Sequence, residues 1–587
     1  MRVCIIGGGA SAMTSAKHLQ EEGIEVEILE QRDCLGGLWA FDKNFPTVTD
    51  RSFASTSKTY LQFSDFPIDE KAHFFPHSSV YIDYLNSYVD TNNLRPLIKF
   101  NHKVTSLRKK GEQWEVTASH GDETYTNTVD AVVVCSGIHY VPLIPEVPDS
   151  ENFEGTIIHS SLLGTANELA GKRVVFVGAG ESTVDIAHDL VAESLCDDVY
   201  ISVRKGLTVT RHWGRPPHLP ADYDSTRAKV WLPRNFLHDY NRRDQDSAFR
   251  TFYTLLGIPL FLLTLPIAFK KSLNLLSVLL DWKTWVAPFR APRRHGPASG
   301  VELCKACEPI CKEPPQSEEE VEERFWKIKN AFDWYSGAMH NSQPFIKRPE
   351  FLKDIARKKI KLVPKIARFS GPREVEFEDG TKVAADVVVM GTGFKSTVSF
   401  LEQQEVDGRT LYKNVFLPDD PSLAFIGFVR ANIGSFPTVS EMQARWVSGV
   451  WSERIKLPDT QQMKKTVKEE AEHYNQTRKL QVGRLTSLID YHPYMTELAG
   501  YVGCRPELWR FLLKPKVLYI LLFGPMASYQ YKLHGYGANQ KMALEALSII
   551  PPLPFQRVMQ HMVLYLFMKP LFSLLGMLGL RKFRPLL

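Results

Sequence analysis

The sequence predicts an α/β protein with two Rossmann-like dinucleotide-binding domains, a membrane-associating insertion and an apolar C-terminal tail. Residues 2–30 and 172–205 show the same pattern, an apolar strand followed by a glycine-rich turn, a helix and a second strand. With 587 residues, the chain is longer than one hydrophobic core can serve. Hydrophobic residues at 44% and aromatic residues at 11% can bury several cores, so we expect an ordered multi-domain protein.

The first glycine-rich turn lies between an expected strand at 3–6 and a helix that reaches residue 19. It has the pattern G-x-G-x-x-A, in which the first glycine allows the tight turn and the second lets the backbone approach a pyrophosphate. The helix start then presents free N–H groups to the phosphates. The second strand, 26–29, ends in an acid, which suits the ribose hydroxyls of FAD or NAD. The residues expected to bind this dinucleotide are Gly7, Gly9, Ser11, Ala12 and Glu30.

A Gly-Gly pair followed by bulky apolar residues comes shortly after that acid, at 36–39. Flavoproteins with two dinucleotides use such a segment to bring the backbone close to the pyrophosphate and the ribityl chain. The segment therefore favours FAD over NAD at the first turn, and it adds Gly37, Leu38 and Trp39 to the expected flavin site.

The second glycine-rich turn follows an expected strand at 173–177 and opens a helix that reaches residue 190. Threonine takes the third small position, so we expect slightly looser packing there. The following strand, 199–203, ends in two cations, which match the 2′-phosphate of NADPH, although a solvated strand end is the alternative. The expected NADPH-binding residues are Gly178, Gly180, Glu181, Ser182, Thr183, Arg204 and Lys205. Hydride transfer from nicotinamide to flavin follows.

Two further apolar strands, within 131–137 and 386–394, end in small residues and glycine. They indicate returns to a flavin-domain sheet after insertions, so Ser136, Gly137, Thr392 and Gly393 are expected near FAD. We therefore expect a first FAD part at 1–165, an NADPH domain at 166–344 and a second FAD part at 345–550. Residues 206–344 form an enlarged insertion, and 551–587 the apolar tail.

Charge and cysteine content exclude several classes of partner. The net charge is +5 without a Lys/Arg block, so nucleic acid is not expected. The spacing of Cys304, Cys307 and Cys311 resembles that of metal ligands, but the cluster lacks a fourth ligand and a nearby histidine pair. We expect no metal site. The apolar start of the chain is too short for a signal peptide and leads straight into the glycine turn.

Several segments resemble the flavin-containing monooxygenases, a class B flavoprotein family, and most closely their eukaryotic, membrane-bound branch. The signature F-x-G-x-x-x-H occurs at 153–159, between the two glycine turns. Leu163 stands where this branch has tyrosine or phenylalanine. Further similar segments are GGLW at 36–39, SDFP at 64–67, FPTV through QARW at 436–446, and FGP followed by YQY at 523–531.

The resemblance implies that NADPH reduces FAD and that oxygen then adds to the flavin, giving a C4a-hydroperoxide that oxygenates nitrogen or sulfur. Family members hold this species with an asparagine just ahead of the SDFP segment, and alignment places Ser55 there. A serine offers fewer donors, so we expect a shorter-lived hydroperoxide or a shifted substrate range. The resemblance also makes His159 a positioning residue in a linker, and Gln443 a candidate for contact with the flavin region.

Two apolar runs with basic flanks, 253–269 and 558–580, suggest docking to an anionic membrane surface. A buried core helix is the alternative for each. Because eukaryotic members of the family lie on the endoplasmic reticulum, we expect monotopic attachment there, with the active site facing the cytosol.

The leading function is NADPH-dependent oxygenation of a small lipophilic amine or sulfide with molecular oxygen. The alternatives are a peroxide-producing NADPH oxidase, a Baeyer–Villiger-type oxygenase and a catalytically silent membrane adaptor. A homo-oligomer is compatible with each of these functions.

Overall fold

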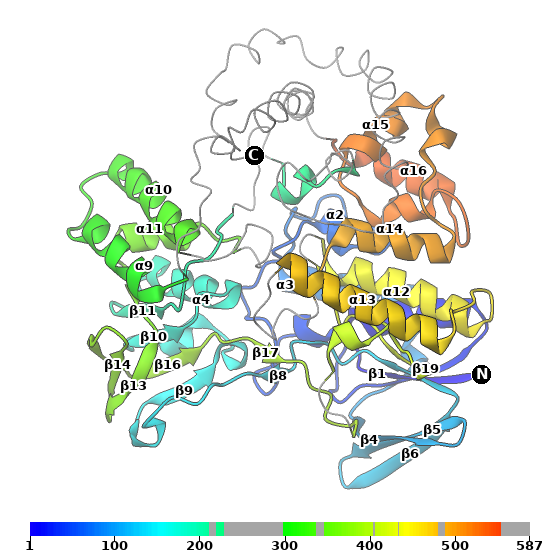
Figure 1. Ribbon diagram of the computed structural model, residues 1–587, viewed down its shortest axis with the longest axis horizontal. Helices are drawn as coiled ribbons and strands as arrows, with labels where there is room; N and C mark the ends of the chain where they lie inside the picture. Colours follow the sequence, from blue (N-terminus) through cyan, green and yellow to red (C-terminus); the bar gives the residue numbers. More distant parts are fainter. Residues whose placement is uncertain are drawn as a thin grey trace.

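The computed structural model describes residues 1–210, 219–227, 298–335, 346–402, 406–431, 434–478 and 488–552. Two sheets, largely or wholly parallel, occupy the two sides of the molecule, and helices cover them (Figure 1). The helices are α1 (Ala10–Glu21), α2 (Lys58–Leu61), α3 (Ser78–Thr91), α4 (Glu181–Ala192), α9 (Gly300–Cys307), α10 (Glu318–Trp334), α11 (Glu350–Ala356), α12 (Phe436–Trp451), α13 (Thr460–Arg478), α14 (Tyr491–Val502), α15 (Pro515–Phe523) and α16 (Gln540–Ile549).

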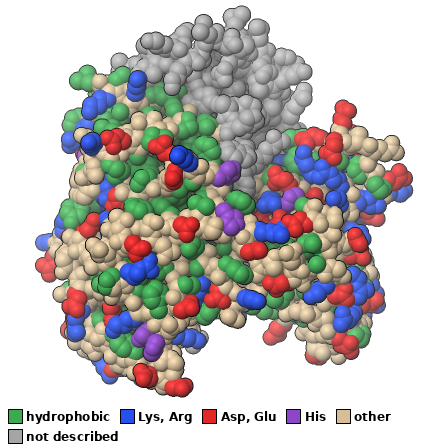
Figure 2. Space-filling model, turned by 180° about the vertical axis from the view of Figure 1, so that it is seen from behind, with side chains coloured by type: hydrophobic (Ala, Val, Ile, Leu, Met, Phe, Trp, Pro, Cys, Tyr) green, Lys and Arg blue, Asp and Glu red, His purple; other side chains and the backbone are tan. Residues whose placement is uncertain are grey.

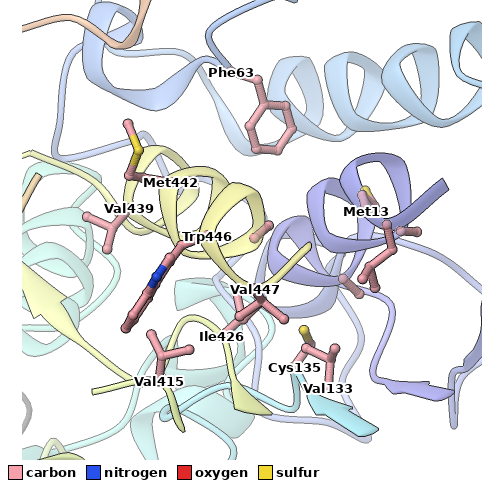
Figure 3. Packing of buried hydrophobic residues seen from close by; sticks show 14 of the residues in the cluster. Met13, Phe63, Val133, Cys135, Val415, Ile426, Val439, Met442, Trp446 and Val447 are labelled. Carbon is pink, nitrogen blue, oxygen red and sulfur yellow. The ribbon is translucent and has the colours of Figure 1, made fainter. Parts of the chain in front are cut away.

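The first sheet has the strand order β18-β19-β7-β1-β2-β3. Strand β1 pairs in parallel with β2 and β7, so the strand that precedes the first glycine turn lies in the middle of the sheet. Helices α1 and α12 pack against each other, and Figure 3 shows Met13 and Trp446 of these helices in the same apolar core as Val133 and Ile426. The strands are β1 (Arg2–Ile6), β2 (Glu25–Leu29), β3 (Ile98–Lys99), β7 (Ala131–Val134), β18 (Phe416–Leu417) and β19 (Asp420–Phe425).

The second sheet is parallel throughout and has the order β12-β11-β10-β16-β9. Strand β10 leads into the second glycine turn from the centre of this sheet. Its residues are buried apart from a partly buried last position, as the run of apolar residues predicts for a strand covered on both faces. The strands are β9 (Thr156–His159), β10 (Val174–Val177), β11 (Val199–Ser202), β12 (Ile360–Val363) and β16 (Val387–Met390).

One strand lies in a different sheet from the one predicted. Strand β7 joins the first sheet beside β1, as expected, but β16 pairs with β10 and β9 in the second. Thr392 and Gly393 therefore follow a strand of the second sheet, and sheet membership does not follow the boundaries expected at 165 and 345. A short apolar run fixes that a strand is buried, but not which parallel neighbour it pairs with.

Small sheets complete the described fold, and all are antiparallel except the parallel pair β20–β21. Strands β8 and β17 pair with each other where the chain passes between the two large sheets. On the face seen in Figure 2, acidic and basic side chains are interspersed. The remaining strands are β4 (Lys103–Lys110), β5 (Gln113–His120), β6 (Glu123–Val129), β8 (Val141–Pro142), β13 (Ile366–Gly371), β14 (Glu374–Phe377), β15 (Lys382–Ala384), β17 (Phe394–Lys395), β20 (Arg430–Ala431) and β21 (Leu488–Ile489).

Candidate functional site

The first glycine turn is a bare-backbone surface because neighbouring chain segments leave no room for side chains. Gly7 has a φ of +109°, and a Cβ there would lie 2.7 Å from the carbonyl oxygen of Cys135. Gly9 is the N-cap of α1, and no side chain caps that end of the helix. A Cβ on Gly37 would lie 3.2 Å from the Cα of Gly9, so the Gly-Gly segment packs directly against the turn. Backbone N–H groups can therefore face a ligand at this point.

Glu30 is fixed beside the first turn. Its carboxylate accepts a hydrogen bond from the backbone N–H of Arg32 at 2.8 Å, and only 5% of the residue is exposed. A Cβ on Gly8 would lie 2.7 Å from Glu30 Oε2, so this turn position also requires glycine. Burial raises the pKa of Glu30, whereas hydrogen bonds from nearby backbone N–H groups oppose that rise. The predicted ribose acceptor thus lies where the sequence places it.

The other expected flavin residues surround this turn. Ser11 and Ser440 share a hydrogen bond of 2.8 Å between their hydroxyls, which ties α1 to α12, and Ala12 is fully buried. The Leu38 carbonyl accepts a hydrogen bond from Val48 N at 3.0 Å. Trp39 lies against Tyr81 with ring centroids 4.8 Å apart. Ser136 and Gly137 are half-buried and come shortly after β7, which pairs with β1 in the middle of the sheet.

The second glycine turn is built in the same way but closes more tightly than predicted. Gly178 has a φ of +96°, and a Cβ there would lie 2.8 Å from the Gly391 carbonyl oxygen. Gly180 is the N-cap of α4. Thr183 is fully buried, and a Cβ on Gly391 would overlap its hydroxyl. The expectation of looser packing at Thr183 is wrong. Gly391, which directly follows the neighbouring strand β16, makes room for the larger side chain.

Two cations, Arg204 and Lys205, follow the end of β11. Arg204 is exposed and Lys205 half-buried, and neither forms a hydrogen bond or ion pair with another described residue. Burial lowers the pKa of Lys205, and the positive charge of Arg204 lowers it further. Glu181 and Ser182 lie in the first turn of α4, half-buried and exposed respectively. An anion bound at the end of β11 would relieve the repulsion between the two cations.

Thr392, Gly393 and His159 meet where the chain crosses between the sheets. The Thr392 hydroxyl donates to the carbonyl of Leu143, and Leu143 N donates to the Gly393 carbonyl at 2.8 Å. His159 is 1% exposed, and its Nε2 lies 2.9 Å from the Gly393 carbonyl oxygen, to which it donates. Burial lowers the pKa of His159. His159 is the last residue of β9 in the second sheet, so it lies within a strand rather than in a linker, and its role in the reaction stays a prediction.

Ser55 and Gln443 differ in how fully their side chains are engaged. Ser55 is half-buried, its hydroxyl has no hydrogen-bond partner among the described residues, and its backbone carbonyl accepts from Lys347 Nζ at 2.7 Å. Gln443 is fully buried; its Oε1 accepts from Gly427 N at 2.9 Å and its Nε2 donates to the Tyr494 hydroxyl at 2.8 Å. Gln443 therefore packs beside the first sheet, and contact with a flavin stays a prediction.

Sequence reasoning missed three charged residues near the expected sites, namely Asp222, Lys347 and Arg430. Lys347 and Asp222 contact the segment that contains Ser55. Arg430, in β20, makes no hydrogen bond or ion pair with another described residue. Of the three, only Arg430 could have been found from the sequence. It is a cation that directly follows the apolar run 423–429, where a strand is expected to end.

The three clustered cysteines behave as packed side chains. Cys307 is buried, Cys304 and Cys311 are half-buried, and burial raises the pKa of each thiol. In the part of the chain that the structure describes, no group of three or more histidine, cysteine or acidic residues is arranged to hold a metal ion.

Comparison with known proteins identifies the family. The profile of the family described as "Flavin-binding monooxygenase-like" matches residues 1–230 and 317–550. The chain belongs to this family. It is therefore a flavin-dependent monooxygenase whose cofactors are FAD and NADPH. Family membership sets aside the alternative of a catalytically silent adaptor.

Individual relatives cover nearly the whole monooxygenase. It is 27% identical over 587 residues to a 4-hydroxybenzoate brominase (decarboxylating) of Pseudoalteromonas luteoviolacea, with 99% of both chains aligned. It is 28% identical over 562 residues to flavin-containing monooxygenase 3 of Homo sapiens, covering 91% of this chain and 89% of the human one. S-allyl-L-cysteine S-oxygenase from Allium sativum superimposes with a TM-score of 0.55 at 19% identity, covering 93% and 97%. Closed cyclohexanone monooxygenase gives 0.55 at 17% identity, covering 86% and 97%.

The predicted position of the monooxygenase on the endoplasmic reticulum is wrong. Relatives from Pseudoalteromonas luteoviolacea and Marinomonas mediterranea align over 99% of this chain, and bacteria have no such organelle. No helix among the described residues is long and apolar enough to span a bilayer. The runs 253–269 and 558–580, on which the prediction was based, lie outside the described residues. Apolar composition alone does not separate a membrane contact from a buried core.

Proposed function

We propose that the monooxygenase binds FAD at the first glycine turn and NADPH at the second, and transfers one oxygen atom from O2 to nitrogen or sulfur of a small lipophilic substrate. The observation that carries this proposal is the contrast between the two second strands. One ends in the buried acid Glu30, and the other in the cations Arg204 and Lys205, which have no hydrogen-bond or ion-pair partner among the described residues. An acid suits free ribose hydroxyls, and two cations suit a ribose 2′-phosphate.

The residues at both turns fit these cofactors. At Gly7 and Gly178 the space that a Cβ would need is taken by backbone, and at Gly8 by the Glu30 side chain, so the chain exposes N–H groups rather than side chains there. When bound, the reduced flavin supplies the activation of O2. The protein positions the two cofactors, keeps water out and leaves the substrate to act as the nucleophile. His159 contributes to positioning, because it hydrogen-bonds the backbone at the crossing between the sheets.

Substrate-dependent NADPH consumption tests the proposal. Purified protein is offered tertiary amines, thioethers and ketones, and NADPH loss, oxygenated product and H2O2 are measured together. We expect product from amines or thioethers in proportion to NADPH. Product from ketones alone would assign Baeyer–Villiger chemistry, and peroxide without product would assign an NADPH oxidase. Both cofactor assignments would be refuted if the purified protein had no yellow chromophore, and if adding NADPH under nitrogen caused no bleaching.

A second candidate substrate class, an aromatic carboxylate or phenolate, is favoured by Arg430. This cation is half-buried and has no partner among the described residues. Burial lowers its pKa, and the negative charge of Glu181 opposes that change. The charge of Arg430 acts on His139, whose ring centroid lies 5.2 Å from that of Phe394 and 5.7 Å from that of Phe436, so aromatic side chains lie in the same region. Partial burial of a cation is unfavourable without a counter-charge, and a ligand carboxylate would pair with Arg430 bidentately.

The brominases that align over the full chain take 4-hydroxybenzoate, which is such an anion. To test this candidate, 4-hydroxybenzoate with and without bromide is compared with uncharged 4-hydroxybenzamide. We expect Arg430→Gln to raise KM for the anion about ten-fold or more, with KM for NADPH unchanged. A rise in KM for NADPH alone would instead assign Arg430 to a cofactor phosphate.

A further inference from the structure

We infer that Asp222 and Lys347, which lie in the chain between β11 and α11, clamp the Ser55–Ser57 segment and thereby suppress wasteful peroxide release. This inference rests on the proposed function, because it assigns the 55–57 segment to the oxygen-handling side of the flavin. The clamp residues are positioning residues.

The two contacts hold opposite ends of the same three-residue segment. Lys347 Nζ donates to the Ser55 carbonyl at 2.7 Å and lies 3.5 Å from the Thr56 hydroxyl. The Asp222 carboxylate accepts from Ser57 N at 2.7 Å. Ser57 is fully buried and Thr56 nearly so, which means that water cannot easily replace either contact.

Lys347 is connected to the NADPH side by a short rigid path. The residue before it, Ile346, forms a parallel bridge with Val209; Ile346 N donates to Thr208 O at 3.0 Å, and Thr210 N donates to Ile346 O at 2.7 Å. Thr208 is three residues beyond Lys205. A ligand held at the end of β11 is thus separated from the clamp by a few hydrogen-bonded residues.

Asp222 belongs to a segment, 219–227, that packs against α2. The Tyr223 hydroxyl lies 2.5 Å from that of Thr59, the two sharing a hydrogen bond, and the Tyr60 hydroxyl donates to the Ser225 carbonyl at 3.2 Å. Burial raises the pKa of Asp222, and the positive charge of Lys347 lowers it. The positive charge of Lys347 therefore favours the charged form of Asp222, and removing Lys347 takes that counter-charge away from a buried acid.

The clamp affects how reducing equivalents are used. Coupled turnover consumes NADPH, H⁺, O2 and substrate, and yields NADP⁺, oxygenated substrate and H2O. If water enters and the oxygen atom is not transferred, NADPH, H⁺ and O2 yield NADP⁺ and H2O2. Holding the 55–57 backbone in place favours the first outcome, because pairing of the Ser55 carbonyl and of the buried Ser57 N–H leaves these groups no need of water.

Two readouts of three variants test the clamp. Lys347→Met removes the donor, Lys347→Arg keeps a donor of the same charge, and Asp222→Asn keeps the shape but removes the negative charge. Lys358→Met is the matched control. Lys358 also donates to a backbone carbonyl, that of Lys312 at 2.9 Å, but this bond does not involve the 55–57 segment. The readouts are hydrogen–deuterium exchange of the 55–57 amides and the H2O2 formed per NADPH oxidised.

We expect Lys347→Met and Asp222→Asn to speed exchange of these amides about ten-fold and to raise peroxide yield several-fold, with anaerobic flavin reduction by NADPH unchanged. Lys347→Arg should restore much of the coupling, and Lys358→Met should match the wild type. Unchanged exchange in both clamp variants overturns the clamp. Faster exchange with unchanged peroxide overturns its role in coupling. If the wild type failed to oxidise NADPH, the proposed function would be refuted instead. Hydrogen–deuterium exchange of the 55–57 amides would still test the clamp in that case.

Discussion

Replacement of Gly391 by alanine should disrupt the second glycine turn. A Cβ at this position would overlap the Thr183 hydroxyl, and it would lie 3.2 Å from Thr183 Cβ and 3.3 Å from the carbonyl oxygen of Val177. Thr183 is fully buried in α4, so its side chain has little room to rotate away. The added methyl group must therefore push α4 away from β10, and the N–H groups that start this helix move with it.

The expected destabilisation is about 2–3 kcal/mol, the usual range for overpacking a rigid site. Thr183→Ala should restore most of the lost stability, because it removes the overlapping hydroxyl. The first turn already has alanine at the equivalent position, Ala12. Thr183→Ala alone should have a small effect, since the lost methyl group is offset by removal of a buried hydroxyl without a hydrogen-bond partner. The double-mutant cycle should thus give a coupling energy of about 2 kcal/mol.

The cycle is measured by chemical unfolding and by NADPH affinity. Gly500→Ala, on α14, is the control, because nothing lies within 4 Å of a Cβ there. This helix substitution should be neutral or stabilise by about 0.5–1 kcal/mol. Additive effects of Gly391→Ala and Thr183→Ala, or a Gly391→Ala protein as stable as the wild type, would refute the packing argument.

Three further predictions concern charge and hydrogen bonding. Joint replacement of Arg204 and Lys205 by alanine should raise KM for NADPH about ten-fold or more and leave KM for NADH unchanged; equal changes would remove the 2′-phosphate assignment. Burial lowers the pKa of His18 to about 4, so the unfolded chain binds this proton more tightly, and stability should fall by up to about 3 kcal/mol between pH 6.5 and 4. His18→Gln should lose that part of the acid sensitivity, which unfolding at both pH values measures. Ser55→Asn should lower peroxide release several-fold, and an unaltered yield would remove Ser55 from the reaction.

Local patterns predicted the two nucleotide units because each depends on residues that are close in sequence. The expected strands at 3–6, 26–29, 173–177 and 199–203 appear as β1, β2, β10 and β11 with ends shifted by at most one residue. The turns between strand and helix depend on glycine conformations that few other residues adopt, so sequence identifies them directly.

Features that depend on distant residues were not predictable in this way. The sheet in which β16 lies is decided by pairing with β10 and β9, and nothing in its own four residues specifies that choice. The fit of Thr183 depends on Gly391, more than two hundred residues away. The contacts of Asp222 and Lys347 with the 55–57 segment likewise join parts of the chain that local periodicity cannot relate.

The family-like segments outside the glycine turns meet in a buried charge cluster rather than at a turn. Lys17 Nζ lies 2.6 Å from Asp65 Oδ2, Lys532 Nζ lies 3.5 Å from the same oxygen, and Glu441 accepts from Ser64 N at 2.8 Å. Burial followed by the charge of Asp65 raises the pKa of Glu441. Removing one partner from such a cluster leaves a buried charge unpaired, which is strongly destabilising, so these residues depend on one another. Because Lys17 lies on α1, the cluster fixes the helix that begins at the first glycine turn.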